Sequence, residues 1–231
     1  MTERSFVAGV DGFPGRWLSF QVSTASRTTE VRILDLPSAL RNRPLDLMLA
    51  AIDIPIGLLD GPRNCDRMAR KLLGPERGCS VFSAPCRAAL SAKDYSEACA
   101  VSQVRTTRKL SRQSWCICPK IREVGDAIGP GTQKWAFEVH PEVSFWAMNN
   151  HRPMAHRKKS REGKAERMAL LKVVFPEIGE HILRRPARVG VDDLLDAAAA
   201  AWSALRIHDG TANCVCPAER DERGLEVTIR Y

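Results

Sequence analysis

Acidic residues stand where three predicted core elements begin or end. Asp11 follows the first apolar strand in FVAGVDG, and Asp53 follows a second apolar strand in LMLAAID. The third group, Asp192, Asp193 and Asp196, opens an amphipathic helix. Carboxylates that meet at one end of a sheet repel one another, and hard divalent cations with a preference for oxygen ligands neutralise them. The pattern therefore predicts a Mg²⁺ or Mn²⁺ site.

Each of these acids also has a purely structural interpretation. Asp11 precedes a glycine, a pair that is common in turns. Asp192 or Asp193 suits the first turn of a helix, where the helix dipole favours a negative charge. Residues three or four apart on a helix share a face, so either of them can point the same way as Asp196. The joint occurrence of the three groups carries more weight than any one of them.

Glu138 is a fifth acidic candidate. It lies in the short apolar strand 135–139, where a charge is unfavourable unless it is paired or bound to a metal. Because side chains alternate along a strand, Glu138 can equally face solvent. His140 precedes a proline in a loop and is interpreted as structural, with a ligand or base role as the alternative.

Two basic regions are candidates for binding a nucleic-acid backbone. Residues 101–122 carry six Lys and Arg side chains and no acid, and Trp115 within them can stack on a base. Residues 152–164 form the second basic region, although such a run is often only a solvated face. The predicted nucleic-acid contacts are Arg112, Trp115, Lys120, Arg122, Lys158 and Lys159.

The overall composition fits an α/β protein with a polyanionic partner. The chain has 231 residues, 44% of them hydrophobic, and a formal net charge of +8. A basic surplus favours phosphate-rich partners through counterion release, although it also serves solubility. No apolar stretch is long enough to span a membrane. The start MTERSFVAGV lacks the apolar core of a signal peptide, so we expect a cytoplasmic protein.

The eight cysteines are expected to be reduced thiols, as is usual in the cytosol. Cys116/Cys118 and Cys214/Cys216 have C-x-C spacing, which is tighter than that of most structural zinc sites. Zinc held by both pairs is the alternative to scattered thiols.

Patterning predicts five sheet strands and a helical block between the fourth and fifth. The strands are expected at 6–10, 17–22, 31–34, 47–52 and 135–139, with a further C-terminal strand in EVTIRY. Helices are expected at 37–42, 63–73, 95–110 and 142–149. A further helix is expected to follow the basic loop HRPMAHRKKSREGK and to end at about Phe175, and the last helix is expected over VDDLLDAAAAAWSALRI. The segment QSWCICPKIREV is expected to be a loop leading into a helix. We interpret 1–231 as one domain, with 60–134 as a mainly helical insertion.

Several blocks of the chain resemble the family called domain of unknown function four-two-nine, whose members are described as predicted RNase H-like nucleases. These blocks are VAGVDGFPGRW, AIDIPIGL, RGCSVFSAPCRAAL, QSWCICPKIREV, EVHPEVSFW and DDLLDAAAAAW. The resemblance extends from about Phe6 to Tyr231 and implies an RNase H-like mixed five-stranded sheet flanked by helices. The opening of the last helix also resembles that of Holliday-junction resolvases. That resemblance places Asp11, Asp53, Asp193 and Asp196 at the four metal-binding positions.

The resemblance further implies hydrolysis of a phosphodiester bond with two metal ions roughly 4 Å apart. Asp11 would bridge both ions, and Asp53 and the helix acids would each hold one. DNA, RNA and small phosphodiesters remain open as substrates, and the sequence makes no prediction of the oligomeric state.

Two other functions remain open at this point. A strand–Asp-Gly–strand opening also occurs in the actin and sugar-kinase superfold, which processes nucleotides and small phosphates. That superfold pairs two such domains, and this chain is too short for the second. A non-catalytic nucleic-acid-binding module is the other alternative, but a surface that only holds phosphate does not need clustered carboxylates.

Overall fold

The sheet has five strands in the order β3-β2-β1-β4-β5. In this computed structural model, which describes residues 5–231, β1 (Phe6–Phe13), β2 (Arg16–Ser23) and β3 (Thr29–Leu34) form an antiparallel meander. β4 (Leu47–Ile52) lies parallel to β1, and β5 (Ala136–Glu138) lies parallel to β4. This is the mixed α/β sheet that was predicted, and it is consistent with an RNase H-like fold. The charged residues at the start of the chain, on which the signal-peptide prediction partly depends, lie outside the described residues.

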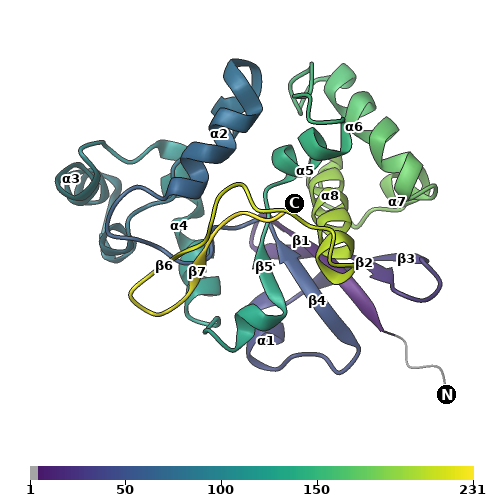
Figure 1. The fold of residues 1–231 in the computed structure, drawn as a ribbon, viewed down its shortest axis with the longest axis horizontal. Helices are drawn as coiled ribbons and strands as arrows, with labels where there is room; N and C mark the ends of the chain where they lie inside the picture. The colour runs from purple at the N-terminus through teal and green to yellow at the C-terminus, as the bar shows by residue number, and fades with distance from the viewer. Residues whose placement is uncertain (1–4) are drawn as a thin grey trace.

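Helices cover both faces of this sheet (Figure 1). One face packs on α8 (Val191–His208), together with α5 (Pro141–Met148), α6 (Arg161–Val174) and α7 (Ile178–Leu183). The other face packs on α1 (Leu36–Arg41) and α4 (Arg112–Gly125). Alternate residues of the central strands divide between the two hydrophobic clusters, as the two-residue period of a strand requires.

Gly9 allows α8 to lie directly on β1. A Cβ atom on Gly9 would lie 2.0 Å from the backbone nitrogen of Ala201 and 2.2 Å from the carbonyl oxygen of Ala197. The facing side of α8 is a run of buried alanines, which also keeps the two backbones close. This contact fixes the position of the acidic start of α8 relative to β1.

The segment between β4 and β5 is helical and irregular. It contains α2 (Asn64–Arg77), α3 (Tyr95–Thr106) and α4, with two short 3₁₀ turns between α2 and α3 and a third after α4. The backbone of α2 is kinked at Gly74, where φ is 64°, next to Pro75. α4 packs against the sheet, whereas α3 packs on the 3₁₀ turn Arg87–Ser91 and, to a lesser extent, on α4. This arrangement is consistent with an insertion, and the boundaries 60–134 stay a prediction.

Four features differ from the predicted elements. β1 continues past Asp11 to Phe13, because pairing with β2 carries the ladder beyond the apolar run. QSWCICPKIREV belongs to α4 rather than to a loop, with Ser111 capping the helix. α3 ends at Thr106, since Thr107 adopts a left-handed conformation. EVTIRY forms only the two-residue strand β7 (Glu226–Val227), paired with β6 (Glu219–Arg220), and two isolated bridges from Arg230, to Val139 and to Cys214.

Within residues 5–231, no helix combines the length and apolarity needed to cross a bilayer.

Candidate metal site

Asp11 and Asp53 lie at the same level on the α8 face of the sheet. The parallel register pairs Val10 with Ile52, and the backbone nitrogen of Asp53 donates to the carbonyl oxygen of Val10 at 2.8 Å. Val10 and Ile52, which directly precede Asp11 and Asp53, both face α4. The two aspartates therefore point to the opposite side, toward α8.

The start of α8 adds Asp196 to this pair. Asp11 is 8% exposed and Asp196 is 3% exposed. Burial raises the pKa of Asp11 well above its usual range, and the charges of Asp53, Asp196 and, more weakly, Asp193 raise it further. Burial, followed by the charge of Asp196, raises the pKa of Asp53 to about 8. We call Asp11, Asp53, Asp193 and Asp196 the carboxylate site.

Lys158 supplies a positive charge to the carboxylate site. Its Nζ donates to Oδ2 of Asp196 at 2.7 Å. Burial alone would lower the pKa of Lys158, but the charges of Asp196, Asp53 and Asp11 outweigh it and raise the pKa. The sequence placed Lys158 among contacts to a nucleic-acid backbone, whereas its ammonium group lies against the buried carboxylates.

Asp193 has two roles that sequence reasoning treated as alternatives. Its Oδ2 accepts from the backbone nitrogen of Gly190 at 2.8 Å, which caps α8. Its charge also raises the pKa of Asp11, by less than burial and the charges of Asp53 and Asp196 do. Asp193 is thus better supported than Asp192 for the fourth position.

Glu142 and His140 border the site with polar atoms that lack a hydrogen-bond partner among the described residues. Oε1 of Glu142 accepts from Arg167, while its Oε2 is buried and unpaired. The charge of Glu142 raises the pKa of both Asp53 and Asp196. Burial lowers the pKa of His140 to about 4, so the ring is neutral and its buried Nδ1 is also unpaired.

These donors fit a hard divalent cation. They are carboxylate oxygens with one neutral imidazole nitrogen, a set that suits Mg²⁺ or Mn²⁺. The buried Oε2 of Glu142, without a partner in the part of the chain described, is an additional acceptor that an ion or its water ligands would satisfy. The sequence did not single out Glu142, because only the tertiary structure turns this first-turn residue of α5 toward Asp53.

Glu138 belongs to a different cluster, on the α4 face of the sheet. It pairs in register with Ile52 and lies on the same face as Ala136. Its Oε1 accepts from Arg63 at 2.5 Å, and its Oε2 accepts from the backbone nitrogen of Ile56 at 2.7 Å. Both oxygens are thus engaged, which favours a supporting role, and its direct involvement in catalysis stays a prediction.

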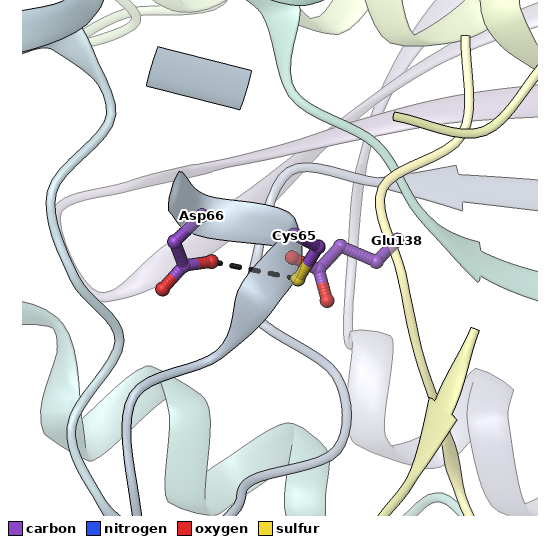
Figure 2. A group of neighbouring side chains, drawn as sticks. All are labelled: Cys65, Asp66 and Glu138. Atoms are coloured by element: carbon purple, nitrogen blue, oxygen red, sulfur yellow. Dashed lines mark hydrogen bonds between the residues drawn. The ribbon is translucent and has the colours of Figure 1, made fainter. Parts of the chain in front are cut away.

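Cys65 and Asp66 lie beside Glu138 (Figure 2). Their ligand atoms form the one group of three within residues 5–231 in which all such atoms lie within 4.8 Å of one another. Arg63 already pairs with both carboxylates of this group, since it donates to Glu138 and its Nε lies 3.4 Å from Oδ1 of Asp66. We call these four residues the Arg63 cluster. The carboxylates of the carboxylate site are spread more widely than 4.8 Å.

The cysteines do not assemble into a four-thiol site in the part of the chain described. All eight are free thiols. Cys118 is buried with Ala98 and Leu110, whereas Cys216 is buried in another hydrophobic cluster with Cys65. The scattered-thiol interpretation fits this arrangement.

Most of the predicted nucleic-acid contacts from the first basic region lie along α4. Trp115 and Arg122 line a surface hollow of about 340 Å³. The ammonium group of Lys120 lies 4.1 Å from the centre of the Trp17 ring and is influenced by the charge of Asp11, so it borders the carboxylate site. Arg112 stacks 3.8 Å above the Tyr95 ring, and Lys159 is exposed.

A family model matches residues 9–222, and its description is "Protein of unknown function (DUF429)". The chain belongs to this family. The match spans β1 to β6, so it includes every residue of the carboxylate site and of the Arg63 cluster. Neither the curated proteins nor the solved structures gave a match.

Proposed function

We propose that this DUF429 protein is a metal-dependent phosphodiesterase that cleaves a nucleic acid at the carboxylate site. The observation that carries the proposal is the meeting of three aspartates on one face of the sheet: Asp11 on β1, Asp53 directly after β4 and Asp196 on α8. Asp11 and Asp196 are buried, and Asp53 is half-buried. Burial and mutual repulsion raise the pKa of Asp11 and Asp53, so the metal-free site has more carboxyl groups than the ammonium group of Lys158 can keep ionised. Burying unbalanced charge is costly, and cation binding is the usual reason for keeping it.

Asp11, Asp53 and Asp196 are the proposed ligands, with Asp193 and Glu142 beside them. A bound Mg²⁺ or Mn²⁺ would activate a water molecule and stabilise charge on the phosphate. Asp11 is central because its strand β1 pairs with β4 and packs on α8. The charges of both Asp53 and Asp196 raise its pKa. Asp193 orients the start of α8 through its cap, which keeps Asp196 in place.

We further propose that α4 holds the nucleic acid. Lys120 borders Asp11 on one side of this helix, and Trp115 and Arg122 line the hollow on another side of it. Cationic side chains bind phosphates, and an aromatic ring stacks on bases without sequence preference. A strand that lies along α4 would therefore have its phosphates near the carboxylate site. The free thiols fit a reducing cytoplasmic location, which forms part of this proposal.

A cleavage screen with Mn²⁺ tests the proposed activity. The substrates are single-stranded DNA and RNA, duplexes, DNA–RNA hybrids and branched junctions. The wild-type protein should cleave at least one of them, and Asp11→Asn should remove the activity while the protein stays folded. Asp192→Asn is the matched control, since it removes the neighbouring acid of α8 and leaves the cap formed by Asp193 intact, and it should keep most activity.

Three outcomes would contradict the proposal. Cleavage that survives Asp11→Asn would place the chemistry elsewhere. Binding of nucleic acid without any Mn²⁺ affinity would favour a non-catalytic binding module. Thermal stabilisation by ATP, without cleavage of any substrate, would favour the kinase-like alternative.

A further inference from the structure

Lys158 reaches the carboxylate site from a loop that is held in place by buried side chains. The loop joins α5 to α6 and carries Lys158 two residues before Ser160, which caps α6. Arg77 donates to the carbonyl oxygens of Met154 and Ala155 at 2.8 and 3.0 Å. These bonds anchor the loop to the end of α2.

The same loop is held to α6 from its other side. The carboxylate of Glu166 accepts from the backbone nitrogens of Ala155 and His156 at 2.7 and 3.1 Å. Arg167, which is fully buried, donates to the carbonyl oxygen of His156 and also to Glu142. A Cβ atom on Gly163 would lie 2.0 Å from the carbonyl oxygen of Arg157, so only glycine permits this close contact.

The backbone around Lys158 is therefore fixed relative to the acids that it faces. Arg167 donates both to the loop and to Glu142, so the same side chain holds the backbone near Lys158 and the acid that borders the carboxylate site. The side chain of Lys158 is 45% exposed, and its ammonium group nevertheless bonds to Asp196. A lysine that only bound substrate from solution would not need this rigid support.

We propose that Lys158 is a permanent cation of the site and takes the place of a second metal ion, so that the protein binds one divalent ion per chain. This inference rests on the proposed function and changes its expected two-ion form. In hydrolysis, water forms a new P–O bond and loses a proton to solvent, while the bond to the leaving oxygen breaks. The leaving oxygen departs with the bonding pair and gains a proton.

In a two-ion site, the second ion stabilises the charge that develops on the leaving oxygen. The Lys158 ammonium group supplies this stabilisation through a charge-assisted hydrogen bond. Its partial exposure lets it contact a phosphate oxygen while its backbone stays fixed.

Titration of the full-length protein with Mn²⁺ tests this inference, with calorimetry and electron paramagnetic resonance used to count bound ions. The wild-type protein should bind one ion per chain. Lys158→Met should bind two, because it frees Asp196 and adds one unbalanced negative charge. Lys158→Arg should still bind one. Lys159→Met is the matched control on the adjacent exposed lysine and should also bind one ion.

Two results would overturn the inference and leave the proposed function standing. These are a wild-type protein that binds two ions and a Lys158→Met protein that still binds one. A wild-type protein that binds no ion would contradict the proposed function itself. Thermal unfolding of each variant in a chelator confirms that the counted protein is folded.

Discussion

The protein has two buried acidic clusters near the carboxyl ends of β4 and β5, and they differ in how their charge is balanced. In the Arg63 cluster, one internal guanidinium group contacts both Asp66 and Glu138, and backbone donors bind the remaining oxygens. In the carboxylate site, Lys158 is the one cation within residues 5–231 that forms an ion pair with any of Asp11, Asp53 and Asp196, and its partner is Asp196. Lys120 and Arg167 interact with Asp11 and Asp196 through their charge alone. The two clusters lie on opposite faces of the sheet.

The difference separates a structural role from a functional one. A buried ion pair whose carboxylate oxygens are all engaged maintains the fold and leaves no acceptor oxygen for a cation. Within residues 5–231 the unpaired buried atom of the Arg63 cluster is a donor, Nη1 of Arg63, which cannot bind a metal ion. Several buried carboxylates with one cation leave both negative charge and acceptor oxygens available. Geometry alone would select the wrong cluster, since the ligand atoms of Cys65, Asp66 and Glu138 are the closest together. Counting the charges identifies the carboxylate site.

The largest expected effect on stability comes from unbalancing the Arg63 cluster. Arg63→Met leaves Glu138 and Asp66 buried without their cation, and loss of one partner of a buried pair typically costs about 3–5 kcal/mol. Urea unfolding of the metal-free protein measures this change. Adding Glu138→Gln to Arg63→Met should recover part of the loss. A loss below about 1 kcal/mol in Arg63→Met would contradict the structural role of the cluster.

A smaller effect should appear in the dependence of stability on pH in a chelator. Asp53, with a pKa of about 8, keeps its proton in the folded protein well above pH 3.8, where the unfolded chain loses it. A raised carboxyl pKa stabilises the folded state at low pH, and this contribution is lost as the pH rises through the folded value. Burial raises the pKa of Glu138 to about 7, which acts in the same direction.

The titration of His140 makes stability rise with pH, but only below pH 6.5, because burial lowers its pKa from that value to about 4 in the folded protein. The melting temperature should therefore fall between about pH 6.5 and pH 8.5, by about 2–4 °C for each kcal/mol lost. Asp53→Asn should flatten this dependence. A melting temperature that rises over the same interval would contradict the raised pKa that burial and the charge of Asp196 give to Asp53.

The smallest effect concerns the basic residues of α4. Arg122→Gln and Lys120→Gln should each weaken nucleic-acid binding and reduce the slope of log K against log salt by about 1. Lys172→Gln, an exposed change on α6, is the charge-matched control and should leave the slope unchanged. Equal slopes for all three variants would remove α4 from the proposed binding surface.

Much of the fold was predictable from sequence because the signals are local. The apolar runs before Asp11 and Asp53 and the alanine-rich face of α8 predicted the central strands and the helix on them. The loop predicted for QSWCICPKIREV was wrong because Pro119 and the two cysteines hid a helix whose stability comes from packing on the sheet.

The site was predictable only in part, because several of its contacts join residues that are far apart in the sequence. The level and face of Asp11 and Asp53 follow from strand order, which the family resemblance supplied. The pairing of Glu138 with Arg63 depends on a contact across 75 residues, and no local pattern indicates it. Lys158 looked like one of several surface cations, and only the packed loop directs it to Asp196.

Binding of Mn²⁺ to matched variants of the two clusters tests the central claim most directly. Isothermal titration should detect Mn²⁺ binding by the wild-type protein and by Asp66→Asn, in which the Arg63 cluster is altered. Asp11→Asn should lose this binding, because it removes the carboxylate that faces both β4 and α8. Binding that survives Asp11→Asn but is lost in Asp66→Asn would contradict the account.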